Sequence, residues 1–161
     1  MAQLLKDRQI IEDSWLILDE TANNLPSGNI MLSIDQCQQY SEQFSEHHGS
    51  IGLWLDGNAD IDGIVELLQQ MSVIAIKFPK FVDGRGFSLA RLLRERYSFE
   101  GELRAIGEFI RDQLYLLQRC GFNAFQFSND EELIEASKSL NDFSETYQVS
   151  ADQKQPLFRR R

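Results

Sequence analysis

The stretch that decides the fold runs from Val73 to Tyr97 and reads VIAIKFPKFVDGRGFSLARLLRERY. Its first six residues are almost all apolar, which is typical of a central parallel strand buried beneath helices. The loop that follows contains one proline and two glycines. An apolar stripe with helical spacing then predicts a helix over residues 87–97; its members are Leu89, Leu92, Leu93 and Tyr97. The stretch therefore predicts a strand, a loop and a helix in an α/β fold.

The same pattern recurs on both sides of this stretch. We expect strands at residues 30–34, 51–55, 73–78, 103–106 and 124–127, and helices at 35–47, 60–71, 87–97, 110–120 and 130–143. Ser88 and Asn129 or Asp130 are candidate N-cap residues for two of these helices. About five successive strand–helix (βα) units indicate an α/β protein with a mainly parallel sheet. A closed eight-unit barrel normally needs about 250 residues, so the chain favours an open doubly wound sheet over a partial TIM-like barrel.

The ends of the chain carry different patterns. Apolar residues around short polar groups predict an N-terminal β-hairpin over residues 3–18, and the segment TANNLPSGN then interrupts the chain. A length of 161 residues with 42% apolar residues suits one domain. We predict a single α/β domain over residues 1–149 and a mobile C-terminal tail over residues 150–161.

Charge is distributed unevenly along an acidic chain. The net charge of −9 disfavours a nucleic-acid partner, because binding to phosphates depends on basic side chains. Residues 1–76 contain two basic and twelve acidic residues, whereas residues 77–119 contain nine basic and six acidic ones. This local excess of basic residues makes residues 77–119 the first place to look for a binding site.

Other features exclude several classes of function. The N-terminus has no secretory leader and no run reaches about 18 apolar residues, so we expect a cytoplasmic protein without membrane contact. Cys37 and Cys120 are far apart, and His47 and His48 have no metal-ligand spacing, so no metal site is predicted. No iron–sulfur, haem or dinucleotide motif is present. We therefore expect no cofactor and no redox catalysis by this chain alone.

The candidate anion site lies where the strand at 73–78 ends. Parallel sheets bind ligands at the carboxyl ends of their strands, and the start of the next helix offers free backbone N–H groups. The groups expected to hold an oxyanion there are Lys77, Lys80, Arg85, Gly86, Ser88 and Arg91. In the alternative interpretation, Arg91, Arg94 and Arg96 form a solvated helix face with Glu95, Glu100 and Glu102 as ion-pair partners.

The next strand and helix add three candidates. Arg104 and Arg111 extend the predicted anion-binding set. Glu108 follows a predicted strand directly and is the candidate catalytic acid or base. A carboxylate beside a guanidinium is also a common structural ion pair, in which its pKa is lowered rather than raised.

Residues 78–127 contain six motifs in a characteristic order. They are FPKF, DGRGFS, RLLRERY, GELRAIG, RDQL and RCGFNAF. In these motifs the chain resembles the bacterial domain-of-unknown-function family 934, and the resemblance extends to KDRQIIEDSW and DFSETYQ near its ends. Family members are commonly encoded beside assimilatory sulfite reductase and are labelled as oxidoreductases of sulfite reduction. The resemblance thus implies a role in sulfur metabolism.

Two classes of function remain open at this stage. In the first, the chain is an accessory protein of assimilatory sulfite reduction that binds sulfite, sulfate or phosphate. In the second, it is a non-catalytic interaction subunit whose basic face docks an acidic partner, such as sulfite reductase or its electron donor.

Overall fold

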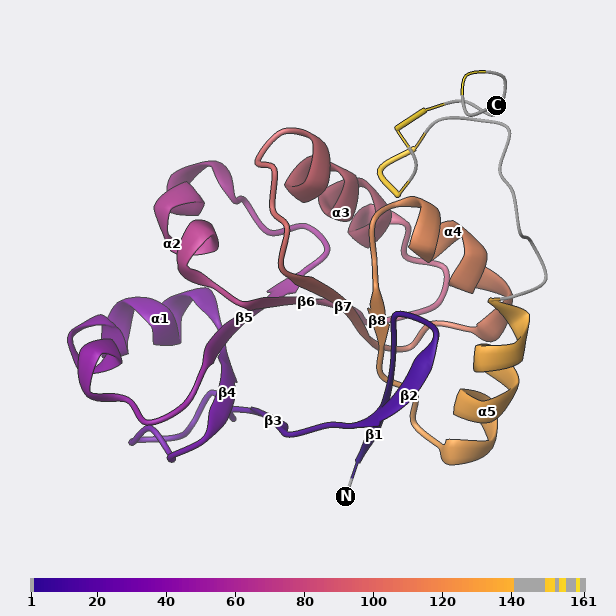
Figure 1. Cartoon of the computed structure of the whole chain (residues 1–161). Coiled ribbons are helices and arrows are strands. Elements are labelled where there is room, and N and C mark those ends of the chain that lie inside the picture. Colours follow the sequence, from indigo (N-terminus) through magenta and orange to yellow (C-terminus); the bar gives the residue numbers. More distant parts are fainter. Residues whose placement is uncertain (1, 141–149, 153, 156–158, 160–161) are drawn as a thin grey trace.

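A single curled sheet of eight strands organises the molecule (Figure 1). The computed structural model describes residues 2–140, 150–152, 154–155 and 159. The strands are β1 (Gln3–Lys6), β2 (Gln9–Glu12), β3 (Trp15–Ile17), β4 (Asn29–Leu32), β5 (Ile51–Asp56), β6 (Val73–Phe78), β7 (Glu102–Gly107) and β8 (Ala124–Phe125). Their order across the sheet is β2-β1-β8-β7-β6-β5-β4-β3. The predicted α/β class is confirmed, but the sheet is mixed, because β1 runs antiparallel to β2 and β8.

The helices lie on the convex side of this sheet (Figure 1). The α-helices are α1 (Ile34–Tyr40), α2 (Val65–Gln70), α3 (Arg85–Glu95), α4 (Leu114–Arg119) and α5 (Asp130–Ser139). Short 3-10 turns η1 (Ser41–Glu46), η2 (Asp62–Ile64) and η3 (Arg111–Gln113) adjoin α1, α2 and α4. The end of the helix predicted at 130–143 lies outside the described residues. None of the described helices is both long and apolar enough to cross a membrane.

The expectation of a doubly wound sheet is wrong. Strands β3 to β8 are parallel and follow one another in chain order. A doubly wound sheet needs a reversal of strand order, which sends later connections across its other face. Without a reversal, every crossover returns on the same side, and the sheet curls as an incomplete barrel does. The parallel run also does not reduce to five repeated units, since β3 leads into β4 without a helix.

The predicted hairpin is shorter than residues 3–18. Strands β1 and β2 pair through Gln3–Lys6 and Gln9–Glu12, joined by a two-residue turn. Trp15–Ile17 instead forms β3, which pairs with β4 at the opposite edge of the sheet. Only Asp13 and Ser14 separate β2 from β3, so this short link brings the two edges of the curled sheet together.

The two faces of the sheet are packed differently. Alternate residues of β6 point to opposite sides, so that Ile74, Ile76 and Phe78 join the large core beneath the helices. Val73 and Ala75 belong to a smaller cluster on the concave side, with Met31, Ile106, Trp15 and Trp54. The concave side also contains buried charges. Arg104 Nη1 donates to both carboxylate oxygens of Asp13 at 2.9 and 3.0 Å, and Arg104 Nε donates to Glu102 at 2.7 Å.

Helix starts agree only partly with the sequence patterns. Asn129 caps α5 as expected, because its Oδ1 accepts a hydrogen bond from Glu132 N at 2.8 Å. Ser88 was expected to cap the third helix, but α3 already begins at Arg85 after Gly84. Ser88 therefore lies inside the helix, where its own backbone N–H is no longer one of the exposed terminal donors.

Candidate functional site

Two lysines extend from the carboxyl end of β6 without a carboxylate partner. Lys77 is exposed at the end of the strand, with Nζ 5.4 Å from the centre of the Trp54 ring on β5. Lys80 is exposed in the loop that follows. Among the described residues, neither ammonium group lies within ion-pair distance of an acid. Both charges are therefore available to an external anionic group.

Arg85 lies at the same end of the sheet, but its charge is already paired. Its Nε donates to Asp83 Oδ1 at 2.9 Å and its Nη2 donates to the other oxygen of that carboxylate. The Arg85 side chain and backbone N–H bonds lower the pKa of Asp83 to about 2. An anion would have to compete with this pair for the guanidinium, although 58% of the Arg85 side chain is exposed.

Gly86 is placed by packing. A Cβ atom there would lie 2.7 Å from the Phe78 ring, and a Cβ atom added to Gly57 would lie 2.8 Å from Gly86 N. Gly86 is buried, whereas Ser88 is exposed on α3. The glycine therefore lets the start of α3 pack against β6, a role that does not require a ligand.

The other predicted arginines lie elsewhere. Arg91 forms an exposed pair with Glu95 one turn along α3, and Arg111 pairs with Glu135 of α5 at 3.3 Å. Arg104 is completely buried in the ion pairs of the concave face. The structure thus brings Lys77, Lys80 and Arg85 to one end of the sheet and separates them from Arg91, Arg104 and Arg111. The ion pair between Arg91 and Glu95 agrees with the alternative interpretation, in which Arg91 belongs to a solvated helix face.

Glu108 reaches the same end as Lys77. Its backbone N–H donates to the Phe78 carbonyl at 2.7 Å, because Gly107 ends β7 beside Phe78. Gly107 has a φ of +90°, and a Cβ atom there would lie 2.4 Å from the Phe78 oxygen. The Glu108 side chain is exposed to solvent. Its position fits the predicted strand end, while a catalytic role for it stays a prediction.

Exposed apolar side chains adjoin the lysines, and the sequence patterns did not single them out. Phe81 is 52% exposed, Val82 71% and Ile110 45%. The two loops touch, because Gln113 Nε2 donates to the Phe81 carbonyl at 2.7 Å. We call Lys77, Lys80, Phe81, Val82 and Ile110 the carboxyl-end patch. The available signal was the pair Phe81-Val82 in the loop directly after Lys80, where large apolar residues are uncommon.

The cysteine and histidine positions offer little reactive chemistry. Burial raises the pKa of Cys37 to about 12 and also raises that of Cys120, so both thiols are held in the unreactive protonated form. His47 Nε2 lies 2.8 Å from the Gly28 carbonyl. Within the described part of the chain, no three His, Cys, Asp or Glu residues are grouped to hold a metal ion.

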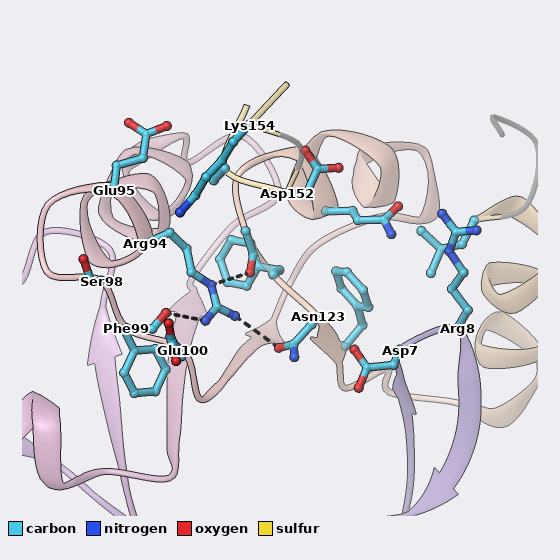
Figure 2. Close-up of a pocket in the computed structure, with 16 residues that line it drawn as sticks. Asp7, Arg8, Arg94, Glu95, Ser98, Phe99, Glu100, Asn123, Asp152 and Lys154 are labelled. Carbon is cyan, nitrogen blue, oxygen red and sulfur yellow. Dashed lines mark hydrogen bonds between the residues drawn. The ribbon is translucent and has the colours of Figure 1, made fainter. Parts of the chain in front are cut away.

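A pocket of about 450 Å³ lies at the opposite, amino-terminal end of the parallel strands (Figure 2). Arg94 extends from α3 into it, and Asn123 lies beside the start of β8. The hairpin turn at Asp7 and Arg8 forms another wall, together with Asp152 and Lys154. Arg94 appeared in the sequence only as one member of a helix face, since nothing local indicates which carbonyl groups it reaches.

Fold and surface together define a small α/β protein with a curled mixed sheet and a lysine-rich apolar patch at the carboxyl end of its central strands. A family model described as a bacterial protein of unknown function (DUF934) matches residues 52–158. The chain belongs to this family, as its motifs indicated. No curated protein and no solved structure matches the chain.

Proposed function

We propose that the protein is a non-catalytic accessory subunit that docks an acidic protein partner through the carboxyl-end patch. The observation that carries this proposal is that the loop after β6 exposes Phe81 and Val82 directly after Lys80, with Lys77 at the end of the strand. Neither lysine forms an ion pair with a described residue. Aromatic and aliphatic groups that bury well supply most of the affinity in protein interfaces, and surrounding charges select the partner. An acidic protein surface is the complement of this combination.

The biological setting rests on the family resemblance. Members of this family are commonly encoded beside assimilatory sulfite reductase, so the partner we propose is this reductase or its electron donor. The accessory subunit would contribute binding rather than electron transfer.

A pull-down with the purified reductase at low and high salt tests the proposal. The variant K77Q/K80Q should lose the salt-sensitive part of the retention, because screening acts on the charges that these substitutions remove. F81S should weaken retention at both salt concentrations, since it removes apolar contact area. K138Q on α5 is the control, being an exposed lysine away from the patch. Equal retention of wild type, K77Q/K80Q and F81S would overturn the proposal.

A second candidate function is binding of a sulfite, sulfate or phosphate ion at the same end. It is favoured by the ammonium groups of Lys77 and Lys80 between β6 and α3, which form no ion pair with a described residue. It is weakened by the Asp83 carboxylate, which already occupies Arg85. Calorimetric titration with each anion separates the two functions: saturable heat that disappears in K77Q/K80Q supports the ion site, and its absence together with reductase retention supports docking alone.

A further inference from the structure

The amino-end pocket, lined among others by Arg8, Arg94, Asn123 and Lys154, lies apart from the carboxyl-end patch (Figure 2). Its volume of about 450 Å³ falls within the range of small-molecule sites, which is about 300–1,000 Å³. Phe99, Phe122 and Phe125 contribute apolar surface to its walls. This combination of apolar walls and basic groups is typical of a site for an organic anion.

Arg94 places a positive charge in the pocket, and within the described part of the chain its guanidinium forms no ion pair, although the nearby Asp7 carboxylate favours its charged form. Its Nη1 donates to the carbonyl groups of Phe99 and Gly101 at 2.6 and 2.9 Å, and its Nε donates to that of Gly121 at 3.0 Å. Its Nη2 has only a long contact of 3.5 Å with Asn123 Oδ1. Burial lowers the pKa of Arg94, but a guanidinium remains charged. With respect to the described residues, one N–H group of Nη2 is thus left to donate into the pocket.

The charges around Arg94 leave an excess of positive groups. Arg8 and Lys154 line the pocket and pair with no acid in the part of the chain that is described. Two lining carboxylates already form ion pairs with arginines that do not line the pocket. Glu95 pairs with Arg91, and Asp152 pairs with Arg119. The other charged groups of the described lining are the Arg94 guanidinium and the carboxylates of Asp7 and Glu100. Among the described lining residues, three basic groups therefore face two acids that form no ion pair, which favours the binding of one anionic group.

Backbone strain is concentrated around the same pocket. The described non-glycine residues with positive φ are Asp7, Arg8 and Ser98, at 48°, 67° and 52°. All three line the pocket. Strained backbone conformations cluster at functional sites, where they hold groups that a relaxed chain would not present.

We propose that the amino-end pocket binds a small organic carboxylate, with the carboxylate group at Arg94 and the apolar body against the phenylalanines. A bare tetrahedral oxyanion is much smaller than the pocket and would leave its apolar walls uncovered. Asp7 and Glu100 are placed to accept hydrogen bonds from hydroxyl or amino groups of such a ligand. This proposal does not depend on the docking function, because the two surfaces lie at opposite ends of the strands.

Two-dimensional ¹H–¹⁵N NMR of the full chain with benzoate as the probe tests the site. Benzoate should shift the Asn123 side-chain amide and the Gly121 and Phe99 backbone amides in a saturable manner. Benzamide has the same ring without the charge and should shift them much less. Sulfate has the charge without the ring, and it should bind more weakly than benzoate.

Substitutions of charged residues at the edge of the pocket test where benzoate binds. R94Q removes contacts to three carbonyl groups and can unfold the chain, so R8Q and K154Q are the informative changes. Each should weaken benzoate binding by about three- to tenfold, as expected for a charged group at the edge of a site. K80Q, at the other end, should leave benzoate binding unchanged while reducing reductase retention. No saturable shift with benzoate, or equal affinity in wild type and R8Q/K154Q, would overturn the proposal.

Discussion

Arg104 illustrates how a single residue can be essential to the fold while its sequence position suggests a ligand site. It is fully buried on β7, where Asp13 and Glu102 surround its guanidinium. Arg104 Nη2 lies 2.7 Å from Glu102 Oε1 but is not aligned for a hydrogen bond, so this nitrogen is left unsatisfied. Lys6 then pairs with Glu102 at 2.9 Å, which links β1, β7 and the β2–β3 connection.

Replacing Asp13 with Asn should destabilise the protein by about 3 kcal/mol, because it leaves a buried guanidinium only partly compensated. Urea unfolding monitored by circular dichroism measures this loss. R91Q is the control, since it breaks the exposed pair with Glu95 and should cost less than about 0.5 kcal/mol. A D13N protein as stable as R91Q would show that the ion pair contributes little.

Asp83 gives the carboxyl end a specific dependence on pH. Its pKa is lowered from 3.8 to about 2 by its hydrogen bonds with Arg85. A lowered folded-state pKa stabilises the fold above the unfolded value, and the contribution disappears as the pH falls from near 4 through about 2. D83N should therefore show a smaller loss of thermal stability than wild type across this interval. Identical pH profiles for D83N and wild type would show that the Asp83–Arg85 interaction does not cause this loss of stability.

The same substitution also tests what Arg85 can bind. With Asp83 neutral, the guanidinium is released to an external anionic group, so D83N should bind an acidic partner or an oxyanion more tightly than wild type. R85A should weaken such binding only slightly in the wild-type background, since Asp83 already occupies the guanidinium. Reductase retention measured side by side for D83N and R85A checks both expectations; weaker binding by D83N would contradict them.

At the level of elements, the β1–β2 hairpin is held by an unusual turn. Its two connecting residues, Asp7 and Arg8, both have positive φ, as a type I′ hairpin turn requires. Arginine is unfavourable in this conformation by about 1–2 kcal/mol, whereas glycine adopts it without strain. The turn therefore costs conformational free energy, and it holds Arg8 at the amino-end pocket.

R8G should raise the stability of the protein by about 0.5–1 kcal/mol, because it relieves the turn at some cost in chain entropy. Chemical denaturation measures the gain. Q9G is the control, placing glycine inside β2 where it should destabilise instead. A destabilising R8G would mean that the Arg8 side chain makes a contact important for folding.

Helix α1 depends on its first residues. Ser33 Oγ accepts from Gln36 N at 3.2 Å, and the Gln36 side chain accepts from Ser33 N at 3.0 Å. A helix of seven residues is too short to be stable alone, so its capping should matter. S33A should cost about 1 kcal/mol in denaturation experiments. S41A is the comparison, since Ser41 lies at the other end of α1 and should matter less.

For the whole molecule, residues before the family match are part of the fold. The match begins at residue 52, yet β5 pairs with β4 on one side and β8 pairs with β1 on the other side of the sheet. A chain starting at residue 52 would lose both neighbours and the buried side chains of Leu4 and Leu5. We expect this fragment to show no cooperative thermal unfolding in circular dichroism. Cooperative unfolding would instead place a domain boundary near residue 52.

The sequence was informative where a structural signal is local. The apolar run at Val73–Phe78, the helical stripe after it and the cap at Asn129 each reflect contacts between near neighbours, and the structure contains all three. The position of Lys77 at a strand end follows from the same run. The start of α3 was placed too late because Ser88 is a favourable cap by type, whereas the packing of Gly86 against Phe78 begins the helix earlier.

The sequence by itself determined the α/β class, the family and the end of the sheet at which the lysines lie, because hydrophobic periodicity and motif order are properties of the chain. Only the tertiary structure decided the strand order, the ion pair between Arg104 and Asp13, and the convergence of Arg8, Arg94 and Lys154 on one pocket. These depend on contacts between residues far apart in the chain, and their energies come from burial and charge pairing. Burial and pairing are settled only when the sheet curls and brings its edges together.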